Sequence, residues 1–349
     1  MNKVIKIKNR VIGGNNPCYV IAEMSANHAG NFNRAIAIIH SAKEAGANCI
    51  KIQTYTADTM TIDSDKEYFQ IKQGTWKGEN LYNLYKKAYT PWEWLAQLKE
   101  EAEKIDLDFL STPYDKTAID FLEELGVNFY KIASFEITDI PLIKYIASKN
   151  KPIIMSTGMA SLEEIEEAVN AVKSQNNNNL CLLKCSSAYP AIPDDMNLKT
   201  MKHLEETFDV VVGLSDHSLG SVSAITAVAM GAKVIEKHFC ISREIENPDS
   251  SFSMEPEEFK KMVEDIRAVE RAIGKISYDI SEKEKINKNF RRSIFVVKDI
   301  KKGEIFTENN IRVIRPAYGL PPKHFEEILG RKASKDIERG TPLEWNMID

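Results

Sequence analysis

The chain has 349 residues, of which 43% are hydrophobic and 28% charged, a composition typical of a soluble globular protein. Its formal net charge of −5 excludes a global positive field of the kind that attracts nucleic acid. No apolar run approaches the roughly eighteen residues that a membrane helix needs, and the basic start leads into no signal sequence, so we expect a cytoplasmic protein.

Five cysteines, an odd number, are scattered through apolar segments with no Cys-x-x-Cys pair. This usage is typical of reduced thiols that pack as small hydrophobic side chains in a reducing compartment. The cysteines are Cys18, Cys49, Cys181, Cys185 and Cys240. A metal-binding role for Cys181 and Cys185 is an alternative, although a thiolate site normally needs a second pair.

The chain begins with an apolar alternation over residues 4–12, which together with Gly13-Gly14 predicts a hairpin plug. From residue 19 onward, short buried-strand patterns alternate with helical spacing. The predicted strands are 19–23, 49–53, 109–111, 129–132, 153–156, 180–185, 210–214 and 234–238. The predicted helices are 32–45, 91–105, 117–125, 141–148, 161–173, 198–207, 222–230 and 256–273.

Eight strands alternating with eight helices in about 275 residues predict an α/β fold, the (β/α)8 TIM barrel. A doubly wound open sheet is the alternative, but it would not normally use so many regular units. An insert at residues 54–90 contains Trp76, Tyr82, Tyr85 and Tyr89. It is long for a strand-to-helix loop, which suits either a cover over a site or a surface excursion packed on its own aromatic side chains.

The pattern changes after residue 274. Residues 275–289 are polar and rich in Lys and Glu, which predicts a linker, and residues 290–349 show short strand patterns punctuated by Gly and Pro. We therefore expect a catalytic barrel at 1–274, a linker at 275–289 and a small β-rich domain at 290–349. Such a domain alone has a thin core, so we expect it to pack on something else, such as the barrel mouth of a partner subunit.

Two apolar runs end in a histidine: residues 213–217 end at His217, and residues 234–238 end at His238. As parallel strands joined by a helix, they would place both imidazoles at one carboxyl-end rim, where α/β proteins carry out chemistry. Such a pair can hold a divalent metal through neutral ring nitrogens and leave other positions for water or substrate. The alternative is that each histidine caps its strand and satisfies a backbone group.

Charged and hydroxyl side chains gather at the other predicted strand ends. Three lysines lie among hydroxyl groups, which suits charge-assisted binding of a phosphate or a carboxylate. Lys184 is the lysine most easily explained as reaching to solvent, and Glu23 can either support a histidine or act as a base. Single hydroxyls can also cap the following helix. The set is Glu23, Asn27, His28, Lys51, Gln53, Thr112, Lys131, Ser134, Ser156, Lys184, Ser186, Tyr189, Ser215, His217, Glu236, His238 and Asp249.

Two other classes of function stay open at this point. Three pocket lysines also suit a Schiff-base aldolase, which would need one lysine among apolar groups rather than among hydroxyls. The small domain could instead be an interaction module whose basic residues, at 291–292 and 298–302, dock an acidic partner.

Seven segments taken together resemble the sialic acid synthase family. They are Ala22-Glu-Met-Ser-Ala-Asn-His28, Ile50-Lys-Ile-Gln53, Phe109-Leu-Ser-Thr-Pro113, Tyr130-Lys-Ile-Ala-Ser134, Met155-Ser-Thr-Gly158, Gly213-Leu-Ser-Asp-His217 and Ile235-Glu-Lys-His238. The resemblance covers essentially the whole chain, because Arg291-Arg-Ser293, Arg315-Pro316 and Gly340 are similar to the family's antifreeze-like, or SAF, domain. So many motifs in the same order make the resemblance highly specific.

The resemblance implies a transferase that condenses phosphoenolpyruvate with the open-chain aldehyde of an N-acetylated amino sugar, giving a nine-carbon 2-keto acid and phosphate. His217 and His238 would hold Mn2+, with Mg2+ or Co2+ as alternatives, and Glu23 would be the acid/base candidate. Arg315 would reach the site from the partner's SAF domain in a domain-swapped homodimer. The residues implied for phosphoenolpyruvate are Lys51, Thr112, Lys131, Ser134, Ser156 and Ser215, and those for the sugar are Gln53, Tyr189, Asp249 and Arg315.

Within the family, the insert and the following Thr90-Pro-Trp-Glu-Trp94 look most like the branch that makes pseudaminic acid, as does Leu183-Lys-Cys-Ser-Ser-Ala-Tyr-Pro190. Ala188 stands beside Tyr189 where neuraminate synthases tend to carry a polar residue. An apolar wall favours a deoxy sugar, since unpaired polar groups beside it cost free energy. The implied substrate is 2,4-diacetamido-2,4,6-trideoxy-L-altrose, and neuraminate or legionaminate synthesis is the alternative.

Overall fold

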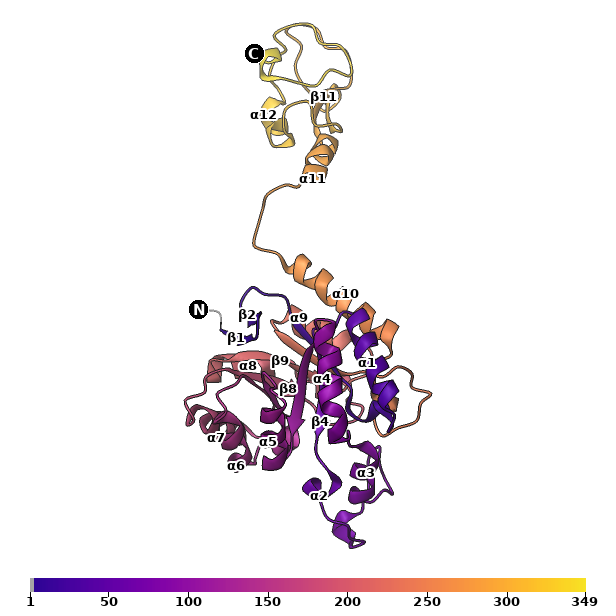
Figure 1. Cartoon of the computed structure of the whole chain (residues 1–349). Coiled ribbons are helices and arrows are strands. Elements are labelled where there is room, and N and C mark those ends of the chain that lie inside the picture. The colour runs from indigo at the N-terminus through magenta and orange to yellow at the C-terminus, as the bar shows by residue number, and fades with distance from the viewer. Residues whose placement is uncertain (1–2) are drawn as a thin grey trace. The chain divides into compact units, whose positions relative to one another are not determined.

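Parallel strands of the first part of the chain close into a barrel surrounded by helices (Figure 1). The computed structural model describes residues 3–349, which divide into one unit ending at Gly274 and a second unit from Lys275 to Asp349. In the first unit eight strands are joined in the order β10-β3-β4-β5-β6-β7-β8-β9. This closed order confirms the predicted TIM barrel and rules out the open doubly wound sheet.

The strands and helices of the barrel lie close to their predicted positions. The strands are β3 (Tyr19–Glu23), β4 (Cys49–Thr54), β5 (Asp108–Pro113), β6 (Tyr130–Ile132), β7 (Ile153–Ser156), β8 (Leu180–Cys185), β9 (Val211–Asp216) and β10 (Val234–His238). The helices that follow them are α1 (Phe32–Glu44), α4 (Leu95–Lys104), α5 (Lys116–Glu124), α6 (Ile140–Ala147), α7 (Leu162–Lys173), α8 (Thr200–Phe208), α9 (Val222–Ala229) and α10 (Pro256–Ile273). Helix α7 begins with the capping box of Ser161 and Glu164.

The amino end of the barrel is closed by a hairpin of β1 (Val4–Ile7) and β2 (Arg10–Gly13), as the sequence predicted. Ile5, Ile7 and Ile12 are almost fully buried and pack against side chains that point into the barrel from its strands. Gly13 has φ +99°, and a Cβ there would lie 2.4 Å from the Lys3 carbonyl oxygen, so only glycine fits the turn. The barrel therefore opens at its carboxyl end.

The insert between β4 and α4 contains two short helices, α2 (Ala57–Met60) and α3 (Leu81–Ala88). Asn80 caps α3 by accepting hydrogen bonds from the first turn. The ring of Tyr55 packs edge-on against both Tyr85 and Tyr114, which joins the insert to the loop after β5. The insert is thus a folded extension of one rim of the barrel.

The second unit has its own small core, which includes the side chains of Ile294, Phe306 and Leu343. Its sheet pairs β11 (Ser293–Val296) antiparallel with β12 (Ile311–Ile314), and a short helix, α12 (Phe325–Ile328), follows. Part of the segment expected to be a linker is helical, α11 (Glu282–Asn287), because Ser281 and Glu284 form a capping box. Across residues 3–349, no helix combines the length and the apolar character required to cross a membrane.

Candidate active site

A cavity of about 360 Å³ lies at the carboxyl ends of the barrel strands. One side of it is polar and comes from the strands and the loops that follow them, and the other is apolar and comes mainly from the insert. The polar and charged lining residues include Ser25, Lys51, Gln53, Lys131, Ser134, Glu136, Ser156, Ser215, His217, Glu236, His238 and Asp249. The apolar and aromatic ones include Tyr55, Met60, Ile71, Trp76, Leu81, Leu84, Tyr85, Ala88, Tyr114, Phe135 and Tyr189.

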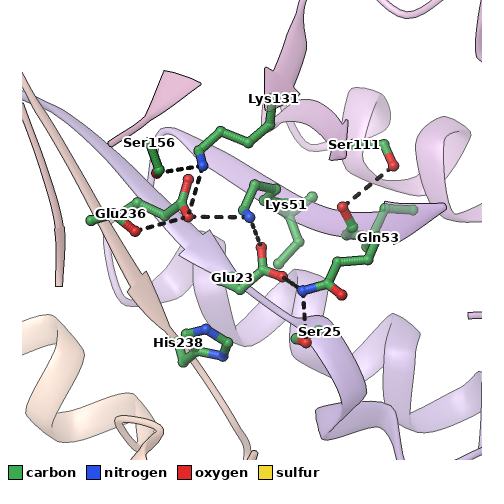
Figure 2. A network of polar contacts seen from close by, with 12 residues as sticks. Glu23, Ser25, Lys51, Gln53, Ser111, Lys131, Ser156, Glu236 and His238 are labelled. Atoms are coloured by element: carbon green, nitrogen blue, oxygen red, sulfur yellow. Dashed lines mark hydrogen bonds and ion pairs between the residues drawn. The ribbon is translucent and has the colours of Figure 1, made fainter. Parts of the chain in front are cut away.

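Two lysines and two glutamates form a buried network at the floor of the cavity (Figure 2). Lys51 lies between the carboxylates, with Nζ 3.0 Å from Glu23 Oε2 and 3.1 Å from Glu236 Oε1. Lys131 donates to the Ser156 hydroxyl at 2.6 Å, and its Nζ lies 3.7 Å from Glu236 Oε1. The strand register produces this arrangement, because Glu23 is paired with Lys51 on the neighbouring strand.

Burial and the neighbouring lysines together move the pKa values of the two carboxyl groups in opposite directions. Burial raises the pKa of Glu23, and the nearby Lys51 ammonium only partly offsets this effect. Burial also acts on Glu236, but the ammonium groups of Lys131 and Lys51 outweigh it and hold the pKa of Glu236 below its usual value. Glu236 is therefore the permanent counter-ion of the lysines, whereas Glu23 can gain or lose a proton near neutral pH.

Both histidines face this cavity, with ring centroids 5.3 Å apart. His217 Nδ1 lies 3.0 Å from the Ser186 carbonyl oxygen, and a proton on Nδ1 would leave Nε2 as a free acceptor. Burial and neighbouring cations lower the pKa of His238, whose Nδ1 is buried with no hydrogen-bond partner among the described residues. Two nitrogen acceptors with unused capacity fit a divalent metal ion.

The groups around the two histidines determine their protonation and how many protein ligands a metal ion would have. Burial opposes a charged His217, but contact with the Cys185 thiol raises the pKa of His217, and the same contact lowers the pKa of Cys185 to about 6. A metal ligand must be a neutral imidazole, so a bound ion would displace that proton. The described residues contain no cluster of three or more His, Cys, Asp or Glu side chains placed to hold a metal. Protein groups would thus supply two ligands, and water or substrate the others.

The structure brings most of the predicted site residues together at the cavity. Those that line it are Lys51, Gln53, Lys131, Ser134, Ser156, Tyr189, Ser215, His217, His238 and Asp249. Glu23 lies beneath the lining and contacts Lys51 and Gln53 rather than a histidine. Thr112 is fully buried, and its hydroxyl has no hydrogen-bond partner within residues 3–349. Arg315 is exposed and belongs to the second unit.

Lys184, which the sequence analysis explained most readily as reaching to solvent, does not belong to the lining of the cavity. It is half-buried and donates to the Cys185 carbonyl oxygen at 2.8 Å. Lys131, which is fully buried, contacts a hydroxyl and a carboxylate rather than apolar groups. These polar contacts are not the apolar setting that the aldolase alternative requires.

Several residues of the site were missed as functional groups in the sequence. Glu236 was recognised at a strand end but given no role, although it contacts both lysines and lies 3.4 Å from the Ser215 hydroxyl. Glu136 lines the cavity two positions after Ser134, and burial raises its pKa to about 7. Its position in the loop after β6 was the available signal. The insert and its aromatic residues were recognised as a possible cover over a site, but which of its side chains line the cavity depends on how the insert folds back.

The insert reaches across the cavity to the loops after β8 and β10. The Trp76 indole donates to the Pro248 carbonyl oxygen at 2.8 Å, and its ring lies 5.4 Å from that of Tyr189. The Thr75 hydroxyl donates to the Tyr189 carbonyl oxygen. Tyr189 in turn packs on His217, with ring centroids 4.4 Å apart. The insert therefore covers the site, as one of the two interpretations of its length predicted.

Comparison with known proteins agrees with this architecture. The NeuB family matches residues 38–278, and the SAF domain matches residues 291–349. A pseudaminic acid synthase of Campylobacter jejuni is 49% identical over 93% of this chain and 95% of its own length, and one of Helicobacter pylori is 46% identical over 95% and 98%. A crystal structure of N-acetylneuraminic acid synthetase from Leptospira borgpetersenii, in complex with citrate, is 34% identical, with a TM-score of 0.73 over 82% of this chain and 95% of that one. The chain belongs to the NeuB family and carries its barrel together with a SAF domain.

Proposed function

We propose that this NeuB-family chain is a pseudaminic acid synthase. In the reaction, phosphoenolpyruvate, 2,4-diacetamido-2,4,6-trideoxy-L-altrose and water give pseudaminic acid and phosphate. The observation that carries the proposal is one cavity with a buried pair of lysines on its floor, two histidines on one side and an apolar wall opposite. The identity to pseudaminic acid synthases from two organisms supports this branch of the family.

Phosphoenolpyruvate would bind over Lys51 and Lys131. Both ammonium groups are buried, and both lie close to Glu236. The two positive charges are therefore held near each other before the phosphate and carboxylate of the substrate arrive. The hydroxyls around them would complete the binding site and fix its orientation. These hydroxyls belong to Ser134, Ser156 and Ser215, which line the cavity.

The two histidines would hold a divalent metal ion, Mn2+ in our proposal, with Mg2+ and Co2+ as alternatives. When bound, such an ion polarises the carbonyl oxygen of the open-chain sugar. C3 of the enol attacks the aldehyde carbon, water adds at C2 of the former phosphoenolpyruvate, and the C2–O bond to phosphate breaks. Glu23 would give a proton to the oxygen of the former aldehyde, which becomes a hydroxyl, or take one from water, since its raised pKa lets it do either near neutral pH.

The sugar would lie between the polar floor and the insert. Gln53, Tyr189 and Asp249 are the proposed contacts to its polar groups, and Arg315 of the partner subunit would join them if the protein forms a swapped dimer. Met60, Ile71 and Leu81 offer methyl and methylene surface on the opposite wall. That wall suits the C6 methyl group of a trideoxy sugar better than a C6 hydroxyl, which would lose its hydrogen bonds to water there.

Phosphate release from phosphoenolpyruvate tests the proposal. The enzyme is given the diacetamido-trideoxy-altrose, its legionaminate-type counterpart or N-acetylmannosamine, each with and without a chelator. Release that is fastest with the altrose and lost on chelation supports both the branch and the metal. Fastest release with another sugar would move the protein to the legionaminate or neuraminate branch, and release with none would refute the reaction class.

A further inference from the structure

A fully buried ion pair joins the two strands that carry the histidines. Asp216 Oδ2 lies 2.8 Å from Lys237 Nζ, and the two side chains are 0% and 1% exposed. Asp216 directly precedes His217, and Lys237 directly precedes His238. The two charged residues are also register partners in the β9–β10 ladder. Each member of the pair is therefore one peptide bond away from one histidine.

The ion pair lies on the outer side of the barrel wall. Ser215 and His217, and likewise Glu236 and His238, line the cavity. Successive side chains of a strand point to opposite faces, so Asp216 and Lys237 point away from the cavity, toward the layer of helices. Neither residue can reach substrate directly, which makes a catalytic role impossible and leaves a structural or a positioning role.

The pair fixes the chain on both sides of His217. Asp216 Oδ1 accepts hydrogen bonds from the Ser218 amide at 2.8 Å and from its hydroxyl at 2.6 Å. Lys237 Nζ donates to the Ser218 carbonyl oxygen at 2.5 Å. The Ser218 hydroxyl oxygen also lies 3.0 Å from the hydroxyl of Ser223 in α9, which can donate to it. Of the three residues Asp216, His217 and Ser218, only His217 lines the cavity.

His238 depends on its backbone for its position. Its Nδ1 has no hydrogen-bond partner in the described part of the chain, and the nearest carboxylate oxygen, on Asp249, is 4.0 Å away. The ring is held by packing against Phe252 and Tyr189. The alignment of β10 with β9 sets where the Cα of His238 lies relative to His217, and this packing sets the orientation of its ring.

Stability alone does not explain a charged pair at this place. Taking both charges out of water is costly, and replacing a buried pair by apolar side chains of similar size is often neutral or stabilising. We propose that Asp216 and Lys237 are positioning residues that hold the imidazoles of His217 and His238 at the separation at which both bind one divalent ion. The inference rests on the metal role given to these histidines under the proposed function.

The test compares single and double variants of the full chain. Asp216→Leu and Lys237→Met each leave one buried charge without a partner and should lower the Tm strongly. The double variant Asp216→Leu/Lys237→Met removes both charges, and its Tm should recover much of the loss seen in the single variants, though not all of it, because the amide and hydroxyl of Ser218 lose their acceptor. Its affinity for Mn2+ alone, measured by calorimetry and by the electron paramagnetic resonance spectrum of the bound ion, should nevertheless fall about 10- to 100-fold.

Asp108→Asn serves as the matched control. Asp108 is a buried carboxylate that pairs with Arg10 at 2.9 Å, but it stands at the amino end of β5, opposite the cavity. This variant should lose stability and keep its Mn2+ affinity. If the double variant does not fold, Asp216→Asn, which keeps an acceptor for Ser218, should still weaken Mn2+ binding several-fold.

Unchanged Mn2+ affinity in a folded double variant, or in Asp216→Asn, would overturn the positioning role. If the unchanged protein binds no Mn2+ yet releases phosphate in the presence of a chelator, the positioning role fails and the proposed reaction stands. If it binds Mn2+ but turns over none of the sugars, the proposed reaction fails, and the comparison of the variants still decides the positioning role.

Discussion

Replacing Lys51 by methionine tests the electrostatic core of the site. The ammonium of Lys51 lies 3.0 Å from Glu23 and 3.1 Å from Glu236, and the residue is only 4% exposed. Its removal leaves two buried carboxyl groups facing each other. Loss of one member of a buried ion pair costs about 3–5 kcal/mol, part of which is recovered when Glu23 takes up a proton.

This compensation makes the stability loss depend on pH. Burial already raises the pKa of Glu23, and in the variant the offsetting cation is absent, so the pKa rises further. A carboxyl group whose folded pKa exceeds its unfolded pKa binds more protons in the folded state, and stability then decreases as the pH rises between the two values. We expect Lys51→Met to lose about 3 kcal/mol at pH 8 and clearly less at pH 5.

The same variant should lose catalytic efficiency. A charge-assisted hydrogen bond to phosphoenolpyruvate is worth about 3 kcal/mol at most, which corresponds to a loss of about 10²-fold in kcat/KM in the phosphate-release assay. Lys184→Met is the matched control, because Lys184 is also a strand-end lysine but contacts the Cys185 carbonyl oxygen outside the cavity lining. It should keep kcat/KM within about threefold. A folded Lys51→Met variant with nearly full activity, or equal losses in both variants, would refute the assignment of Lys51.

Three further predictions concern the wall, the proton and the second unit. Met60→Gln adds an amide to the wall at nearly constant volume, and it should shift the ratio of kcat/KM for a 6-hydroxy sugar to kcat/KM for the 6-deoxy sugar about tenfold toward the 6-hydroxy sugar. Ile62→Gln is the control, because Ile62 belongs to the same insert but is 61% exposed, and it should leave this ratio unchanged. If Glu23 donates the proton, kcat/KM should fall as the pH rises through the raised pKa of Glu23. Glu23→Gln should then lower the rate about 10²- to 10⁴-fold and remove this decrease at high pH from the pH–rate profile. If the decrease persists in Glu23→Gln, another group donates the proton. Deleting residues after Gly274 should leave a folded barrel by circular dichroism without activity, and full activity in this truncation would refute a role for Arg315.

The sequence predicted the barrel and much of the candidate site because both depend on local patterns. Strand ends can be recognised from short apolar runs, and in parallel strands those ends meet at one rim, so residues such as Lys131 and His238 could be assigned to the cavity. Thr112 was placed on the correct strand, but sequence could not tell that its hydroxyl is enclosed rather than open to the cavity. The role of Glu236 follows from distances to two lysines on other strands, which no local pattern encodes.

The apolar wall was beyond the sequence for a different reason. Its residues come from a long insert whose helices pack through tertiary contacts such as Tyr55 against Tyr85, so neither periodicity nor spacing indicates which side chains face inward. The helix α11 was missed because its six residues are too few for a periodic pattern to be recognised, although the sequence does contain the capping box of Ser281 and Glu284.

The hairpin that closes the amino end of the barrel has a kinetic consequence. Side chains of the strands and of the hairpin fill the barrel below the cavity, so reactants cannot enter from the amino end and must all approach from the carboxyl side. For the proposed reaction, the small reactant bound on the lysine floor would have to enter before the sugar, and the sugar would then stand between it and solvent. We therefore expect compulsory-order kinetics, in which excess sugar inhibits by occupying the opening of the cavity before phosphoenolpyruvate has bound.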